Sequence, residues 1–433
     1  MKKLKLTLVA FIFLQFAYAQ EVDGDLKALI QKSFAYFPRL KELEQQVEIS
    51  SLREDVTRSG YRPTLTGNAT YSYLNPVSII QIPTGPGTFN EIQTQPYGNQ
   101  NVNVGVTQVI YDFGRIKKSV EKSKYDVLIA QDNLELNKVT LAAQISATYF
   151  NIIYLEQSLG VQDSVIDYFN QYKKVIDNRI KRGDALEFDA LTAQSNIDQA
   201  NNRRVDLQNQ LQRQYNILSY STGETQSRFS GKSLLGFPLG TVSADSLMAI
   251  ARRNNLELQL NNKRILAQEA DVALSKSNFL PTLNLNGSAG FRNGYQPDIF
   301  QTRFNYLVGA GLVIPIYNGN RTRDQLKISK STLMAARFAA STVEAGIKRD
   351  IDQALADLQA ATDRLRNIES QVAQASRALE LAKSRFRNGT ITYVELLNSQ
   401  TNLQQAFLFK LQYAYQQTLA KVELARLLGI TYW

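Results

Sequence analysis

The segment RNGTITYVELLNSQ at residues 387–400 interrupts a sequence that otherwise reads as one very long helix. The segment KRGDALEFDALTAQ at 181–194 does the same 206 residues earlier, and each has an acidic residue six positions after its glycine, Gly389 or Gly183. Glycine tolerates the left-handed backbone in which helices commonly end. The two segments therefore predict turns at which a long helix stops and the chain returns as a second helix.

An internal repeat covers most of the chain. YRPTLTGN (61–68) matches FLPTLNLN (279–286) at an offset of 218 residues, and IYDFGR (110–115) matches IYNGNR (316–321) at an offset of 206. The second offset then continues without a gap through both glycine turns. Few residues are identical between the two halves, but the matching segments keep the same spacing. This constant spacing indicates that the chain contains two copies of one unit.

The first copy is longer than the second. The offset falls by twelve residues between the two matches, and the Pro/Gly-rich segment 82–100 lies in this interval. Such a composition is typical of a loop. We therefore expect the extra residues to form a loop at 82–100.

The N-terminal segment has the layout of a cleavable secretory signal. Three lysines precede an apolar stretch at 6–16, and Ala-Tyr-Ala at 17–19 supplies a small-x-small cleavage site. The alternative, an uncleaved anchor helix, needs about 20 apolar residues to span a bilayer. We expect cleavage after Ala19. The chain has no cysteine, which excludes disulfides and a lipid-modified N-terminal cysteine.

Composition also limits the chemistry that the chain can perform. The absence of histidine and cysteine excludes a histidine-based catalytic triad, a cysteine nucleophile and the usual imidazole or thiolate metal sites. The net charge is +10, but acidic residues alternate with basic ones along the sequence. This pattern indicates a solvated helical surface rather than a nucleic-acid partner. We expect no cofactor, no metal site, no nucleic acid and no enzymatic activity.

Four segments alternate between apolar and polar residues as β-strands do. In the last of them, 304–314, one face carries Phe304, Tyr306, Val308 and Leu312. Strands of about ten residues with aromatics near their ends suit a membrane β-barrel, although a soluble β-sandwich shows the same alternation. A closed barrel needs about eight strands. A barrel would therefore require several copies of the chain to pool their strands.

The long helices carry a coiled-coil pattern. Large apolar residues recur every seven positions from Ile351 to Phe386, and a second, mostly alanine series runs from Ile347 to Ala382. The segments 116–181 and 322–387 would each form a helix roughly 100 Å long at 1.5 Å per residue. A helical tube joined to a barrel is the simplest object with these lengths.

At this point the chain resembles the TolC-type outer-membrane efflux protein family over essentially the whole mature sequence. The resemblance rests on the duplicated unit, on segment 37–65 with its echo at 255–283, on IYDFGR and IYNGNR after a strand, and on the glycine turns. It implies a mainly α fold with a transmembrane β-barrel. Four strands per subunit would contribute to a twelve-stranded trimeric barrel, continued by a long periplasmic α-helical barrel.

The resemblance also implies location, partners and organisation. The protein would be an exit duct in the outer membrane of a Gram-negative bacterium, with most of the chain in the periplasm. Its partners would be two further copies in a homotrimer, a periplasmic adaptor (membrane fusion) protein, an inner-membrane pump of the RND or ABC type, and outer-membrane lipid. The expected organisation is a signal peptide at 1–19, a first repeat at 20–223 (helix, β-hairpin 64–111, long helix 116–181, short helix 186–220), an equatorial linker at 224–246 and a second repeat at 247–433 (helix, β-hairpin 282–317, long helix 322–387, short helix 392–428).

The candidate functional residues lie at the two turns. Gly183 and Gly389 would form the periplasmic tip, and Asp189, Glu395 and Asn398 would lie near its constriction, where carboxylates favour cations. The simpler interpretation of Asp189 and Glu395 is a helix start, where acids are favoured by the helix dipole. The family's latching tyrosine and arginine are replaced here by Phe386 and Ile391. A closed state would therefore depend on different contacts.

Two further groups of residues have assigned positions. Four arginines flank the turns, namely Arg179, Arg182, Arg385 and Arg387, and they would either contact the adaptor or cap helix C-termini. Pro63 and Pro281 stand where helix gives way to strand, because proline ends a helical hydrogen-bond ladder.

Two other classes of function remain open from the residues alone. A periplasmic coiled-coil scaffold also uses helical hairpins, but it has no use for paired amphipathic strands in each repeat. An outer-membrane enzyme would need converging catalytic groups, and the sequence offers no such constellation. The sequence identifies neither the transported substrate nor the particular pump.

Overall fold

The computed structural model describes residues 24–224 and 244–433. The expected signal peptide at 1–19 lies outside the described residues, as does most of the expected linker at 224–246. The chain divides into two units. The first comprises the described parts of 1–44 and 132–259 together with 341–433, and the second comprises 45–131 and 260–340.

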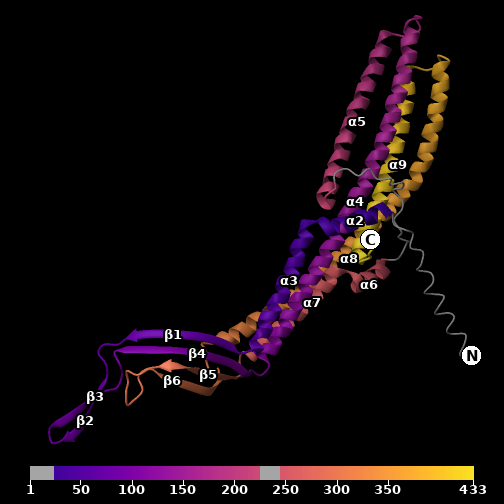
Figure 1. The fold of residues 1–433 in the computed structure, drawn as a ribbon. Helices are drawn as coiled ribbons and strands as arrows, with labels where there is room; N and C mark the ends of the chain where they lie inside the picture. Colours follow the sequence, from indigo (N-terminus) through magenta and orange to yellow (C-terminus); the bar gives the residue numbers. More distant parts are fainter. Residues whose placement is uncertain (1–23, 225–243) are drawn as a thin grey trace, which may run out of the picture. The chain divides into compact units, whose positions relative to one another are not determined.

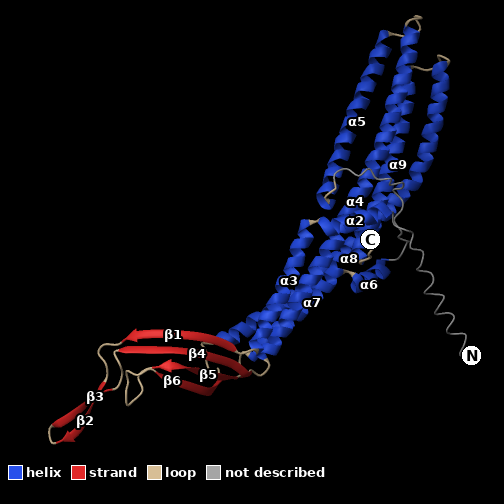
Figure 2. Ribbon diagram, viewed as in Figure 1, coloured by secondary structure: helices blue, strands red, loops and turns tan. Residues whose placement is uncertain are grey.

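Helices make up most of the described chain, and the strands belong to the second unit (Figures 1 and 2). The helices are α2 (Gly24–Tyr36), α3 (Pro38–Arg58), α4 (Arg115–Ile180), α5 (Glu187–Thr222), α6 (Ala244–Asn254), α7 (Leu256–Ser277), α8 (Arg321–Arg387) and α9 (Tyr393–Leu428). The strands are β1 (Thr64–Tyr73), β2 (Ile79–Gly85), β3 (Thr88–Gln93), β4 (Gly98–Tyr111), β5 (Thr282–Arg292) and β6 (Arg303–Val313).

Four strands form one antiparallel sheet in the order β1-β4-β5-β6 (Figure 1). Thr64 pairs with Thr107 in the first hairpin, and Thr282 pairs with Val313 in the second. The offset of 218 residues relates Thr64 to Thr282, and the offset of 206 residues relates Thr107 to Val313, so the second pair is the repeat of the first. The two hairpins therefore share one register, and the sheet is built from two copies of the same hairpin.

The expectation of a loop at 82–100 is wrong. Strands β2 and β3 occupy part of this segment and pair with each other, apart from the main sheet. Ile80 and Ile82 flank Gln81, whose side chain donates to the Glu91 carboxylate across the pair at 2.9 Å. Gly87 adopts a positive φ of 83° in the tight turn between the strands. The Pro and Gly residues thus mark the turn of a hairpin, and the flanking residues retain strand character.

The observed helices follow the repeat. The expected helices at 116–181, 186–220, 322–387 and 392–428 correspond to α4, α5, α8 and α9, with ends that differ by at most two residues. The first helix of the chain is divided into α2 and α3 at Phe37. Pro38 explains this division, because proline cannot donate a hydrogen bond and disfavours a helical residue before it.

The core of the first unit lies between its helices. Leu26 and Ile30 of α2 pack with Ile145, Tyr149 and Ile152 of α4 in the largest buried cluster. On α8, the two apolar series predicted from the heptads supply buried residues to this unit's clusters, namely Ile347, Ile351, Ala354, Leu379, Ala382 and Phe386. Helix-period apolar stripes thus account for the packing of this unit.

The ends of α5 and α9 are equivalent in the two repeats. Gly223 and Gly429 follow these helices with φ angles of 75° and 66°. A Cβ at Gly429 would lie 2.3 Å from the Asn254 carbonyl oxygen, and one at Gly223 would lie 2.6 Å from the Tyr36 ring. Both positions therefore require glycine for its backbone conformation and for its lack of a side chain.

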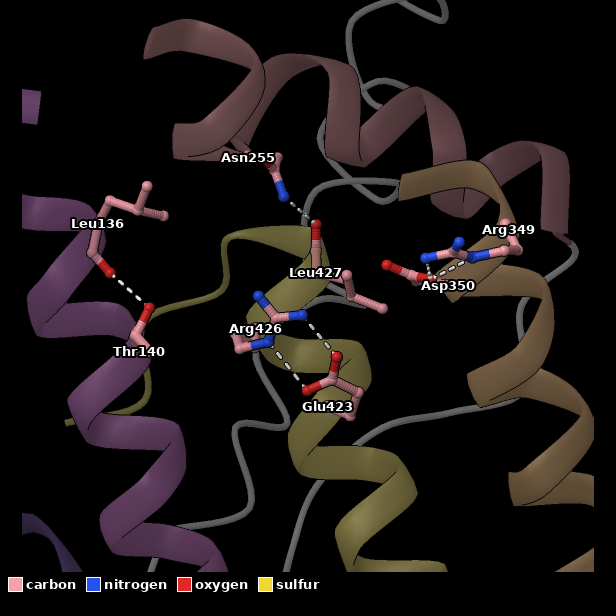
Figure 3. A network of polar contacts seen from close by, with 8 residues as sticks. All are labelled: Leu136, Thr140, Asn255, Arg349, Asp350, Glu423, Arg426 and Leu427. Carbon is pink, nitrogen blue, oxygen red and sulfur yellow. Dashed lines mark hydrogen bonds and ion pairs between the residues drawn. The ribbon is translucent and has the colours of Figure 1, made fainter. Parts of the chain in front are cut away.

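Asn255 joins two helices next to Gly429. Its amide nitrogen donates to the Leu427 carbonyl at 2.8 Å (Figure 3). Its amide oxygen accepts from the backbone N–H groups of Glu257 and Leu258. Asn255 therefore caps the end of α9 and the start of α7 together. One turn earlier on α9, Arg426 and Glu423 form a two-bond ion pair (Figure 3).

Candidate functional site

The two glycine turns have the same backbone geometry. The Asp184 N–H donates to the Arg179 carbonyl at 2.9 Å, and the Gly183 N–H donates to the Ile180 carbonyl at 2.9 Å. In the second turn, the corresponding bonds run from Thr390 to Arg385 and from Gly389 to Phe386, at 3.0 and 3.1 Å. These paired bonds form a Schellman motif. Gly183 and Gly389 occupy its left-handed position, with φ angles of 80° and 73°.

Glu395 lies three residues after Thr392, the residue that caps the start of α9, and the two residues form a capping box. The Thr392 N–H donates to the Glu395 carboxylate at 2.7 Å, and the Glu395 N–H donates to Thr392 Oγ1 at 3.3 Å. The Thr392 hydroxyl also lies 2.9 Å from the same carboxylate. These bonds favour the ionised acid and lower the pKa of Glu395. Within one chain, the geometry of Glu395 is therefore that of a helix cap.

Asp189 has the same place in the first turn, but half of the capping box is missing. Its carboxylate accepts from the Leu186 N–H at 3.2 Å. Leu186 has no side-chain oxygen to return the interaction, and the Asp189 N–H donates to the Leu186 carbonyl at 3.0 Å. Asp189 is half-buried, whereas Glu395 is exposed.

The remaining predicted tip residues are on the surface. Asn398, Arg182 and Arg387 are exposed, and Arg182 forms a 3.7 Å ion pair with Asp184 inside its own turn. Phe386 is buried, and Ile391 packs at the edge of the same apolar cluster. The structure thus brings Asp189, Glu395 and the glycines to the helix turns and leaves the three polar side chains facing solvent.

Arg179 is one of the four arginines expected either to cap a helix C-terminus or to contact the adaptor, and within the chain it is a cap. Its Nη2 donates to the Phe386 carbonyl at 2.7 Å and to the Arg387 carbonyl at 3.3 Å. Its guanidinium carbon lies 4.4 Å from the centroid of the Phe386 ring. Arg179 therefore caps the C-terminal end of α8 from α4, combining charge, hydrogen bonds and a cation–π contact. Its position in the last turn of α4 was the only available signal.

An aromatic cluster lies beneath this clamp. Tyr172 lies 5.8 Å from Phe386 by ring centroids, and Tyr393 lies 6.3 Å from Phe386. The Lys383 ammonium lies 5.0 Å from the centroid of Tyr168. Burial raises the pKa of the Tyr168 and Tyr393 hydroxyls. The two repeats are therefore joined next to the glycine turns through a mostly apolar interface.

The first turn exposes more apolar surface than the second, in which Val394 is 48% exposed. Leu186, Phe188 and Leu191 are 70%, 68% and 65% exposed. The corresponding residues 206 positions later are Thr392, Val394 and Leu397, and Leu397 is half-buried against the first repeat. The first turn thus presents an apolar surface beside Arg182.

Pro63 and Pro281 lie far from the turns in sequence and belong to the second unit. Each stands one residue before a strand, β1 or β5. The helices that precede them, α3 and α7, end at Arg58 and Ser277.

Metal and membrane features were sought in the part of the chain that the structure describes. No group of three or more acidic side chains there has an arrangement that could hold a metal ion. No helix in residues 24–224 or 244–433 combines the length and apolar character needed to cross a membrane.

Comparison with known proteins gives consistent matches. The profile of the family described as "Outer membrane efflux protein" matches residues 29–224 and 247–430. The chain is 23% identical to the outer membrane protein OprJ of Pseudomonas aeruginosa, over 94% of this chain and 84% of that protein. It is 25% identical to the outer membrane protein TolC of Vibrio cholerae, over 72% and 66%. Its fold matches the open state of the MtrE outer membrane channel of Neisseria gonorrhoeae with a TM-score of 0.77 at 17% identity, covering 94% of this chain and 90% of that one.

Proposed function

The chain belongs to the outer membrane efflux protein family, and from this premise we propose that three copies assemble into one exit duct. Proteins of this family are channels rather than enzymes, and this chain is a channel subunit of the Gram-negative outer membrane with most of its residues in the periplasm. It acts with a periplasmic adaptor and an inner-membrane transporter. The assembly, the tip and the contacts with partners are the proposed parts.

The edges of the sheet carry the proposal of assembly. Within the described residues, β1 and β6 each pair on one side only, and an open edge is a template for another strand. Inside the chain, β4 meets β5 with Thr107 opposite Asn286. The same register between copies would place Val313 of β6 opposite Asn68 of β1. Three four-stranded sheets joined in this way would close a twelve-stranded barrel.

The outer face of such a barrel would be apolar. Phe304, Tyr306, Val308 and Leu312 alternate along β6 and are 58–77% exposed in the single chain. Alternation of lipid-facing and lumen-facing residues is the pattern of membrane β-barrels. We assign this face to outer-membrane lipid.

At the other end of the long helices, the turns at Gly183 and Gly389 would form the periplasmic tip. Threefold symmetry would bring three copies of Asp189, Glu395 and Asn398 around one opening. A ring of carboxylates favours cations. Glu395 keeps its negative charge when it caps α9. The same residue could therefore cap the helix and attract cations at the opening.

The adaptor contact is assigned to the outer surface of the turns. Arg182 and Arg387 supply positive charge there, and Leu186 and Phe188 add exposed apolar area at the first turn. Aromatic and aliphatic anchors beside arginine are typical of protein interfaces. The inner-membrane pump would be of the RND or ABC type.

Assembly is tested on the full mature chain extracted in detergent. Light scattering and single-particle imaging should give three copies with threefold symmetry. Asn68→Cys combined with Val313→Cys should form a disulfide between copies, whereas Asn68→Cys combined with Val308→Cys, which is out of register, should not. A stable single copy or pair would contradict the proposal.

The tip is tested by ion selectivity in planar bilayers. Glu395→Gln should lower the preference for cations, and Asn398→Asp should raise it. Glu380→Gln, which removes an exposed acid from α8 before the turn, is the matched control and should leave the reversal potential unchanged. Equal reversal potentials for all variants would contradict a role of Glu395 in ion selectivity and would support only its role as a helix cap.

A further inference from the structure

Within one chain, the two repeats meet between α4 and α9, and we call this interface the intrachain seam. Gln404 of α9 donates to Gln162 of α4 at 3.0 Å. The rings of Tyr154 and Tyr415 stack with their centroids 5.2 Å apart. At the tip, Arg179 extends the seam from α4 to α8. Helix α9 therefore contacts both α4 and α8 in this unit.

The duplicated sequence defines a second seam of the same kind. Each residue of α4 or α5 has a repeat image 206 positions later, on α8 or α9. We propose that a second copy of this chain docks its α5 on α8, in the same way that α9 docks on α4 within one chain. We call this interface between copies the copy seam. It is polar, and Arg385 clamps it. The inference rests on the trimer of the proposed function and adds the contacts made between its helices.

Arg385 is the repeat image of Arg179. It is exposed, and within the described chain its guanidinium makes no hydrogen bond or ion pair. The carbonyls that Arg179 binds, Phe386 and Arg387, have images at Ile180 and Lys181. The Ile180 carbonyl accepts from the Gly183 N–H, as the Phe386 carbonyl accepts from the Gly389 N–H. Since a carbonyl has two lone pairs, it can also accept from Arg385 of the neighbouring copy.

The clamp between copies would be weaker than the one inside the chain. Arg179 gains a cation–π contact because Phe386 lies beneath it at 4.4 Å. Ile180 holds the corresponding position in the next copy and has no aromatic ring. The Arg385 clamp therefore depends on charge and hydrogen bonds, which salt screens.

The walls of the two seams also differ. A groove of about 720 Å³ follows the intrachain seam and is lined by Val161, Val165 and Tyr168 of α4 and by Leu403, Phe407 and Leu411 of α9. The repeat images are Asn367, Gln371 and Gln374 on α8 and Ile197, Asn201 and Val205 on α5. Four of the six apolar positions thus become amides.

At two further positions, an apolar residue becomes charged and a charged residue changes sign. Leu379, which is buried at the intrachain seam, has Lys173 as its image, and Lys383 has Asp177. Lys173 and Asp177 form an ion pair at 3.1 Å on the surface of α4. The copy seam would therefore be more hydrated and more salt-sensitive than the intrachain seam.

The experiment uses engineered cysteines, which report cleanly because the chain has none. Tyr172 and Phe386 are neighbours at the intrachain seam, and their images are Ala378 and Ile180. Ala378→Cys with Ile180→Cys in the full detergent-extracted chain should give two-copy and three-copy bands on a denaturing gel after reaction with a short bismaleimide crosslinker. Adding Arg385→Gln, or raising the salt concentration, should slow this reaction several-fold, and Arg385→Lys should restore part of the rate.

The control pair is Gln162→Cys with Gln404→Cys, which should link within each chain at a rate independent of salt and of Arg385. A trimer by light scattering that yields no band between copies would overturn the copy seam while leaving the proposed function intact. Bands that form at the same rate with Arg385→Gln and in high salt would overturn the polar clamp. Absence of a trimer would overturn both the inference and the assembly on which it rests.

Discussion

Leu186 and Thr392 hold the same position in the two tip turns, and only Thr392 gives the following helix a side-chain acceptor. Both residues have extended backbones, with φ and ψ of −92° and 151° for Leu186 and of −76° and 161° for Thr392. Thr392 Oγ1 accepts from the Glu395 N–H, whereas Leu186 has no oxygen to offer Asp189. The two turns therefore share a backbone but differ in the completeness of their caps.

Leu186→Thr should complete the first capping box. A side-chain cap is worth about 1 kcal/mol, and Leu186 is 70% exposed, so its removal costs little packing within the chain. Amide hydrogen exchange at the start of α5 should slow roughly fivefold. The reverse change, Thr392→Leu, should speed exchange at the start of α9 by a similar factor. Unchanged exchange in both variants would contradict the capping assignment.

The stability of the second turn should depend on pH through Glu395. Its folded pKa is lowered from 4.5 by hydrogen bonds with Thr392, so the ionised acid favours the folded cap. This contribution is fully present above pH 4.5 and is lost as the pH falls through the lowered folded pKa. Exchange rates at the start of α9 should therefore rise below pH 4.5 in the wild type, after correction for intrinsic rates. Glu395→Gln should abolish this rise, and a retained rise would assign it to another group.

Two glycines with similar backbones should respond differently to alanine. Gly389 has a φ of 73° and open space where a Cβ would stand, so Gly389→Ala should cost about 1–2 kcal/mol from the left-handed backbone alone. Gly429 has a φ of 66°, and its Cβ would lie 2.3 Å from the Asn254 carbonyl oxygen. Gly429→Ala should therefore be clearly more destabilising by denaturant unfolding, because the backbone around Asn254 must move.

The control for both changes is Gly160→Ala. Gly160 lies inside α4 with open space around it, and alanine in a helix interior is favoured by about 0.5–1 kcal/mol. This variant should be neutral or stabilising. Equal losses for Gly389→Ala and Gly429→Ala would show that the close approach to Asn254 contributes nothing.

The architecture could be predicted from the sequence because its helices and strands follow periodic patterns of apolar residues and a sequence repeat. The heptad series on α8 identified residues such as Ile351 and Leu379 that the structure buries, and the repeat offsets reproduced the register of both hairpins. The prediction of a loop at 82–100 is wrong, because Pro and Gly in this segment do not exclude strands on either side of a turn. A hairpin needs those residues only in its turn, and the isoleucines around them form β2.

The contacts that join the repeats could not be predicted in the same way. The sequence indicates Arg179 as a helix cap, but it does not indicate that the capped carbonyls belong to a helix more than 200 residues away. Asn255 gave no signal either, although it caps α7 and α9 together. Long-range polar contacts depend on where helices end in space, and periodicity carries no such information.

The C-terminal residues are a further case, and they yield a prediction that changes sign with pH. The ring of Trp433 packs edge-on against Phe34 with the centroids 5.8 Å apart, and the Tyr432 hydroxyl lies within hydrogen-bond distance, 3.0 Å, of Ser146 Oγ. Burial raises the pKa of Tyr432 from 10.0 to about 12, so the folded state favours the neutral phenol. This contribution is present below pH 10 and is lost as the pH rises toward 12.

Tyr432→Phe should therefore lower stability by about 1 kcal/mol at neutral pH, because it loses a hydrogen bond, and should shift alkaline unfolding to higher pH. Unfolding curves across pH would reveal this crossing, and Tyr220→Phe, at an exposed ring, should show neither effect. A Tyr432→Phe curve parallel to the wild type would mean that the phenol of Tyr432 ionises without opposing the fold.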